Sequence, residues 1–220
     1  MPPHLEPGTP ALIAGSLLAL LCFAKAARGV DWRGLSTSGR LNLWLGTTAA
    51  LMVLWRLRAG AHPGLDVHLI GATVVYLMFG TRLAVVSLAI AALGAGLAAH
   101  EPLEVIGLHW LLWAGVPLLA SASAVPWAER RLPAHPFVFL WGYGFVVSGL
   151  AVGASGLAQV LVYGVLQALP WPVLTDDYLP FFLLLGWSEA FTAGALLTLM
   201  VVWQPGWVER FDDAVYLRRR

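Results

Sequence analysis

Seven segments made almost entirely of apolar residues constrain the fold of this chain more than any other feature. They cover residues 11–27, 41–55, 68–80, 83–99, 105–125, 137–168 and 179–203. Most approach the ~20 residues that an α-helix needs to cross a bilayer. The chain of 220 residues is 59% hydrophobic and only 11% charged, whereas about 25% of the residues in a soluble domain are charged. The sequence therefore predicts an all-α fold, a polytopic bundle of about seven transmembrane helices.

The basic residues predict how this bundle is oriented. If all seven segments cross and the N-terminus is outside, 11 of the 13 Lys and Arg residues lie on the cytoplasmic side. If the short segment 68–80 does not cross, that number falls to 4 of 13. The excess of basic residues inside therefore favours seven crossings, with the C-terminus in the cytoplasm. We expect one transmembrane domain over residues 1–204 and a short amphipathic cytoplasmic tail over residues 205–220.

Metal-binding side chains gather in the stretch from residue 61 to residue 72. His62, Asp66 and His68 lie close together, and Pro63 and Gly64 bend the chain between them. Neutral imidazole suits Zn, Ni, Co and Cu(II), whereas Mg and Ca prefer oxygen ligands. We predict a metal site at the membrane surface that uses His68, with His62 and Asp66 beside it. Spacing alone leaves a ligand and a solvated loop residue as equal alternatives for His68.

The histidines are concentrated on one predicted side of the membrane. Five of the six are expected on or near the outer side: His4, His62, His68, His100 and His109. We expect His100 to be solvated. Because an imidazole must be neutral to bind a metal, we expect metal retention to fall as the pH drops through about 6.5.

One carboxylate lies inside a predicted span. Glu189 is about ten residues into the last apolar segment. A carboxylate at this depth is costly and rarely faces lipid, so we expect Glu189 to face the protein interior. Two roles remain open: a hydrogen-bonded residue that holds helices together, with Ser188 or Thr192 as partner, and a residue that carries a proton or senses the cation.

Small residues recur at intervals of four along two of the predicted helices. Gly149 and Gly153 form a GxxxG pair, and Gly15 and Ala19 have the same spacing. Small residues at this spacing allow helix backbones to approach closely in lipid. They predict either packing within the chain or a face that docks another membrane subunit.

The sequence contains no catalytic signature, and we expect that the chain is not an enzyme. It has no GxxxxGKS/T motif for binding ATP and no HExxH or GxSxG motif. The single cysteine, Cys22, excludes a disulfide within the chain. A net charge of +1 gives no indication of a nucleic-acid partner.

Several motifs appear together in a characteristic order. His68-Leu-Ile-Gly-Ala72 is followed by Leu77-Met-Phe-Gly80, and later by the stretches 105–110 and 186–190. This order, with a degenerate His4-Leu-Glu-Pro-Gly8 at the start, resembles the CbiM/NikM family. These proteins are the substrate-binding membrane subunits of cobalt and nickel energy-coupling-factor transporters. The stretches 177–182 and 211–217 are similar to a short proteobacterial branch of the family.

The resemblance implies a metal-capture subunit in the bacterial cytoplasmic membrane. Cobalt or nickel would be its substrate, no covalent cofactor would be present, and a transmembrane coupling subunit with paired ATPases would supply energy. The family binds its metal with the N-terminal amine, the His after the initiator Met, and a loop His. The loop His corresponds to His68, and His4 is the nearest N-terminal match.

Two departures from the family pattern affect the metal site. Pro2 and Pro3 precede His4, and proline has no backbone N–H that could be lost to make an amide ligand. His109 and Trp110 stand where the family has an Asn-Met stretch. These differences leave open another metal, a site shifted to His62 or His109, or loss of the transport role.

Two alternatives from other functional classes remain. In the first, His68 and His109 are axial ligands of one haem in an electron-transfer membrane subunit. In the second, the chain is a non-transporting assembly partner that keeps the fold and binds no metal. An optical spectrum would separate haem from a simple metal site.

Overall fold

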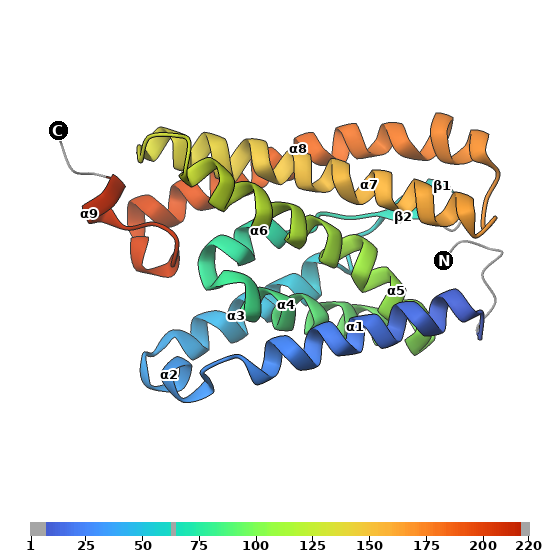
Figure 1. Cartoon of the computed structure of the whole chain (residues 1–220), viewed down its shortest axis with the longest axis horizontal. Coiled ribbons are helices and arrows are strands. Elements are labelled where there is room, and N and C mark those ends of the chain that lie inside the picture. Colours follow the sequence, from blue (N-terminus) through green and yellow to red (C-terminus); the bar gives the residue numbers. More distant parts are fainter. Residues whose placement is uncertain (1–7, 63–64, 217–220) are drawn as a thin grey trace.

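The computed structural model describes residues 8–62 and 65–216 and shows a bundle of helices with one short β-hairpin (Figure 1). The helices are α1 (Pro10–Arg28), α2 (Trp32–Thr37), α3 (Arg40–Leu54), α4 (Ala72–Ala98), α5 (Leu103–Trp110), α6 (Val116–Glu129), α7 (Ser148–Val165), α8 (Leu179–Trp203) and α9 (Asp213–Tyr216). Strands β1 (Ala59–His62) and β2 (Leu65–Val67) pair antiparallel. π-Helical stretches link α5 to α6 and extend α7 and α8 at their starts: Leu111–Gly115, Val138–Val147 and Val173–Tyr178.

Within the described residues, five helical stretches are long and apolar enough to cross a membrane. They are Pro10–Arg28, Ala72–Ala98, Leu103–Glu129, Val138–Val165 and Val173–Trp203. The expected multi-pass helical membrane protein is thus confirmed. The predicted segment 41–55 corresponds to α3, which has 15 residues. The predicted segments 68–80 and 83–99 correspond to the two parts of α4, residues 72–79 and 81–98, which meet at a non-helical Gly80 without a loop between them. Residues 68–71 precede the helix.

Gly80 divides α4 into two parts. Its φ of 71° and ψ of 178° interrupt the helix, and this region of conformational space is essentially restricted to glycine. Met78 just before the break accepts a hydrogen bond from Arg40, and Arg82 just after it donates to the Gly29 carbonyl. The break therefore lies at the end of the bundle that holds the α1–α3 connection. Residues 72–79 run toward this end and residues 81–98 run back from it.

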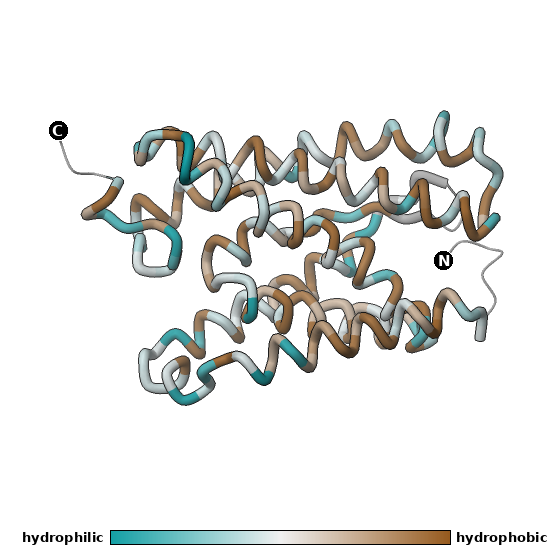
Figure 2. Tube along the Cα trace, in the orientation of Figure 1, coloured by the Kyte–Doolittle hydropathy of each residue, from teal (hydrophilic) through white to brown (hydrophobic). Residues whose placement is uncertain are grey.

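Charged residues pair mainly at the two ends of the bundle, where Figure 2 shows hydrophilic connections around the more hydrophobic helices. At the end near Gly80, Arg40 pairs with Glu209 at 3.3 Å and Arg210 pairs with Glu129 at 3.1 Å. At the opposite end, Arg58 pairs with Glu101 at 2.7 Å. This separation is typical of a bundle whose apolar middle lies within a bilayer.

The described part of the C-terminal tail packs on the bundle. Val208, Phe211 and Tyr216 are buried, and the helix that contains Tyr216, α9, has only four residues. The backbone N–H groups of Glu209 and Arg210 donate to the carbonyls of Met78 and Leu77 at 3.2 and 3.1 Å. The tail therefore satisfies carbonyl groups at the end of the short 72–79 helix.

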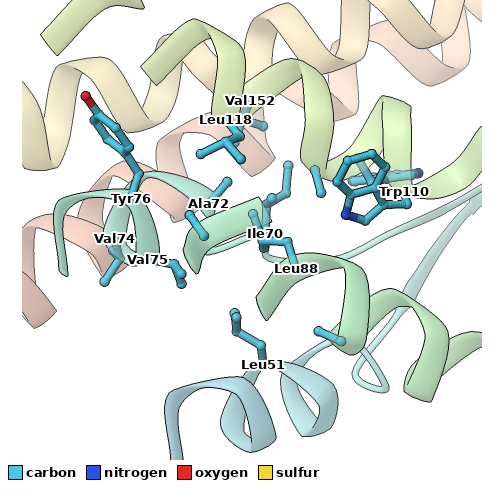
Figure 3. Packing of buried hydrophobic residues seen from close by; sticks show 14 of the residues in the cluster. Leu51, Ile70, Ala72, Val74, Val75, Tyr76, Leu88, Trp110, Leu118 and Val152 are labelled. Carbon is cyan, nitrogen blue, oxygen red and sulfur yellow. The ribbon is translucent and has the colours of Figure 1, made fainter. Parts of the chain in front are cut away.

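The buried core surrounds the start of α4. Figure 3 shows Ile70 and the first residues of α4 among side chains from α3, α5, α6 and α7. The labelled side chains from those other helices are Leu51, Trp110, Leu118 and Val152. Ile70, Ala72, Val75 and Tyr76 are each at most 1% exposed. The residues that follow His68 are thus enclosed by protein and do not face lipid.

The small residues differ in what they contact. A Cβ on Gly149 would lie 3.2 Å from the Gly186 carbonyl oxygen, so these glycines bring α7 and α8 together. Gly15 in α1 packs against Leu108 of α5 in the same way, and Ala19 on the same helix is buried. Gly153 has nothing within 4 Å of such a Cβ and lines an open apolar groove between α7 and α8.

Candidate functional site

The structure describes the side chains of only some of the predicted site residues. His4 lies outside the described residues. His62 is in β1 and Asp66 is in β2, and their side chains are likewise outside the description. His68 is buried and His100 is exposed, whereas His109 is partly exposed on α5.

His68 follows β2 in a four-residue segment that leads to α4. The segment ends at Gly71, whose φ of 73° places it in the left-handed region. A Cβ on Gly71 would also approach the Leu51 side chain to 2.9 Å. The left-handed conformation therefore favours glycine here, and a larger residue would also force the Leu51 side chain to move.

Irregular backbone inside a membrane protein must have its polar groups satisfied by the protein. The carbonyl of Ile70 accepts a hydrogen bond from the indole N–H of Trp55 at 3.1 Å. The N–H groups of Ile70 and Gly71 both donate to Glu189, at 2.8 Å to Oε2 and 2.5 Å to Oε1. Trp55 and Glu189 thus fix the turn that carries His68.

Glu189 is 4% exposed and projects from the middle of α8 to the N-terminal end of α4. Both of its carboxylate oxygens accept backbone hydrogen bonds, an arrangement that suits an acceptor-only ionised group. A negative charge is also favourable at a helix N-terminus. The expected partners Ser188 and Thr192 do not contact it in this way, because each donates to a carbonyl of its own helix.

The His68 ring is enclosed by tryptophans. It stacks on Trp113 with ring centroids 4.5 Å apart and an interplanar angle of 24°, and Trp55 lies 4.9 Å away at 43°. Burial, reinforced by the nearby His109, lowers the pKa of His68 from 6.5 to about 3. The imidazole is therefore neutral at physiological pH, the state that binds a metal.

The expected loss of metal at pH 6.5 does not apply to this ring. That expectation assumed a solvated imidazole with an unperturbed pKa. Desolvation of His68 moves its protonation several pH units lower.

His109 lies next to His68, with ring centroids 6.0 Å apart. Its Nδ1 atom is 3.7 Å from Glu101 Oε2, and the other carboxylate oxygen of Glu101 pairs with Arg58 at 2.7 Å. Burial alone would raise the pKa of Glu101, but His109 and Arg58 outweigh it and lower that pKa. An ionised Glu101 therefore links the guanidinium to the imidazole.

Both imidazoles keep one nitrogen free. Among the residues that the structure describes, Nε2 of His68 and Nε2 of His109 are buried and have no hydrogen-bond partner. Across the same residues, no group of three or more His, Cys, Asp or Glu side chains is arranged to hold a metal. The described part of the chain thus offers a pair of imidazole nitrogens, and further ligands would be water or groups outside it.

Comparison with known families gives the context for this pair. A model described as the cobalt uptake substrate-specific transmembrane region matches residues 7–207, nearly the whole chain. The chain belongs to the CbiM family. No curated protein and no solved structure matches it. The match confirms the resemblance seen in the motifs and identifies a multi-pass membrane protein of a cobalt-uptake family, which suggests a transport component and not an enzyme.

Several residues around this CbiM-family site were only weakly indicated by the sequence. Trp113 falls in the middle of an apolar segment, where interfacial tryptophans are not expected, and that position was the available hint of a buried role. Arg58 is one of two basic residues predicted outside, which marked it as unusual. Its partner Glu101 and the contact of both with His109 depend on tertiary structure.

Proposed function

We propose that this protein captures a divalent cobalt or nickel ion from the outer side of a bacterial cytoplasmic membrane for uptake. The observation that carries the proposal is the free, buried Nε2 of His68, a neutral imidazole nitrogen held in a turn with fixed geometry. Membership of a cobalt-uptake family supports the same conclusion. Imidazole favours cobalt and nickel over the more abundant Mg and Ca.

We propose that the chain passes between the two sides of the membrane seven times. The seven passes would be α1, α3, the two parts of α4 (residues 72–79 and 81–98) and the three later long helices. The end that holds Arg40, Arg82 and Arg210 would face the cytoplasm, in agreement with the excess of basic residues in its connections. The end that holds Glu101 and the start of α1 would face outward, and the cation would enter there.

Energy must come from other subunits, because the chain has no nucleotide-binding motif. We propose a transmembrane coupling subunit and ATPases as partners. The groove that Gly153 lines between α7 and α8 has a volume of about 740 Å³ and is almost entirely apolar. Partly buried small residues that line such a groove suit a helix of the coupling subunit.

Glu189 has a positioning role in this proposal. Its carboxylate does not contact the His68 imidazole. It accepts hydrogen bonds from the backbone amides of Ile70 and Gly71, two and three residues after His68. Groups that orient metal ligands contribute to metal affinity without touching the ion. Glu189 therefore supports the geometry of His68 and is not itself a carrier of the ion or of a proton.

A bis-histidine haem is the less favoured alternative. The Trp113 ring centroid lies 4.5 Å from that of His68 and 5.8 Å from that of His109. The indole therefore occupies space beside the midpoint of the two imidazoles, which a porphyrin bound by both would need. A non-transporting assembly role would leave the buried Nε2 of His68 without a purpose.

Metal binding by purified protein tests the proposal. Isothermal titration with Co²⁺ or Ni²⁺ should show a single site in the wild type, and the site should be lost in His68→Ala. The matched control is His100→Asn, an exposed histidine with φ of 58° that asparagine can adopt. Equal metal content in His68→Ala and wild type would refute the site. A Soret band in the purified protein would favour haem.

A further inference from the structure

The two free imidazole nitrogens belong to residues that lie far apart in the sequence. His68 precedes α4 and His109 is in the last turn of α5, yet their ring centroids are 6.0 Å apart. Trp113, one turn beyond His109, packs against both rings. The fold therefore brings the two side chains to one place and covers them with one indole.

The hydrogen bond of His68 determines which of its nitrogens is free. Its Nδ1 lies 3.0 Å from the Leu69 carbonyl oxygen. A carbonyl can only accept, so Nδ1 carries the hydrogen and the lone pair is on Nε2. A buried acceptor without a partner costs about 1–3 kcal/mol and requires an explanation.

Glu101 favours the same choice for His109, with Nε2 as the free nitrogen. The carboxylate faces Nδ1 at 3.7 Å and is itself held by Arg58. Because a carboxylate only accepts, this placement favours the hydrogen on Nδ1 and the lone pair on Nε2. Metal-binding histidines usually have their second nitrogen facing a carboxylate or a backbone carbonyl. His109 and His68 show one of each.

The separation of the rings fits a shared ion. A metal lies ~2.1 Å from a ligating imidazole nitrogen and hence about 3.2 Å from the ring centre. Two rings on opposite sides of one ion are then about 6.4 Å apart, and rings at a smaller angle are closer. The observed 6.0 Å therefore allows a shared ion when the two rings lie nearly opposite each other.

We propose that His109 is a second imidazole ligand of the transported cation, with Glu101 and Arg58 as positioning residues that fix its tautomer. The inference rests on the proposed metal capture and adds a ligand that is particular to this chain. It also compensates for Pro2 and Pro3, because a backbone amide that proline cannot supply is replaced by a side-chain nitrogen.

Cobalt binding to His109→Gln tests the inference directly. Glutamine keeps the polar character of the position, so the variant is suited to fold. Its affinity for Co²⁺ should fall by more than ~100-fold, and Glu101→Gln should lose ~10–100-fold, as expected for an outer partner. X-ray absorption spectra of the Co²⁺-loaded wild type should show at least two imidazole ligands, and those of His109→Gln should show one fewer. His100→Asn should keep wild-type affinity.

The possible results separate the two proposals. If His68→Ala abolishes binding while His109→Gln keeps wild-type affinity and imidazole count, capture at His68 stands and the second ligand is refuted. If the wild type binds neither Co²⁺ nor Ni²⁺, both are refuted. Thermal unfolding of each variant with and without Co²⁺ guards against misfolding, because a folded protein that binds the ion gains stability in proportion to its affinity.

Discussion

Replacing Glu189 by glutamine should destabilise the protein, although the two side chains have nearly the same shape. Both carboxylate oxygens accept from backbone N–H groups, at 2.8 Å from Ile70 and 2.5 Å from Gly71. Glutamine supplies one acceptor oxygen and one NH₂ group, so one backbone N–H would face another donor. Hydrogen bonds to charged groups contribute about 1.5–3 kcal/mol each, and a buried unpaired donor costs about 1–3 kcal/mol. We expect Glu189→Gln to lower the free energy of unfolding by about 2–4 kcal/mol.

Denaturant unfolding in detergent micelles measures this loss, and cobalt titration of the same samples measures its effect on the site. Ser188→Ala is the matched control, because Ser188 is exposed and bonds only within α8. It should change stability by no more than ~0.5 kcal/mol. If Glu189→Gln unfolds like the wild type but loses metal uptake, the positioning role is wrong and a proton- or cation-sensing role is favoured.

Four further predictions test other parts of the structure. Because burial lowers the pKa of His68 to about 3, the folded state binds fewer protons than the unfolded state between pH 3 and 6.5. Stability should therefore fall as the pH drops through this window, by about 1.4 kcal/mol per unit, and His68→Gln should flatten the slope measured by unfolding at pH 4–7. Gly80→Ala should lower the free energy of unfolding by about 1–3 kcal/mol in the same assay, because alanine is strained in the backbone conformation of Gly80. An unchanged free energy of unfolding would contradict the break in α4. Phe211 packs on Phe139 and Tyr216, so Phe211→Ala should lower the free energy of unfolding by about 3–5 kcal/mol. A loss below ~1 kcal/mol would mean that the tail is not docked on the bundle. Cysteines at Gly8 and Ala214, in a background without the native cysteine, should label from opposite sides of spheroplasts, and labelling from one side would refute the orientation.

The class of fold was predictable from the sequence because apolar length and basic-residue bias reflect the bilayer directly. The exact bounds of the short helix at the start of α4 were harder to predict. Hydropathy marked 68–80 as a separate segment, but it reports burial and not backbone conformation, so it did not show that the helix begins only at Ala72. Gly71 and Gly80, both with positive φ, define the ends of the 72–79 helix. Glycine in an apolar run does not reveal which conformation it adopts.

The candidate site was only partly predictable for a related reason. His68 stood out because it lies in a recognisable motif at the start of an apolar segment. The contact between Glu189 and the turn after His68 joins residues more than a hundred positions apart. Local sequence indicated that Glu189 needs a polar partner in the membrane, and it suggested the nearby Ser188. The actual partners are backbone amides, which leave no trace in the side-chain sequence.

The most direct test of metal capture is the location of the ion itself. Crystals of the protein grown with Co²⁺ should show a peak of anomalous scattering at the cobalt edge, bonded at ~2.1 Å to Nε2 of His68. The same crystals of His68→Ala should lack this peak. The proposed function would be contradicted if the strongest peak in the wild type lay at a position that His68 does not contact. It would also be contradicted if the peak persisted unchanged in His68→Ala.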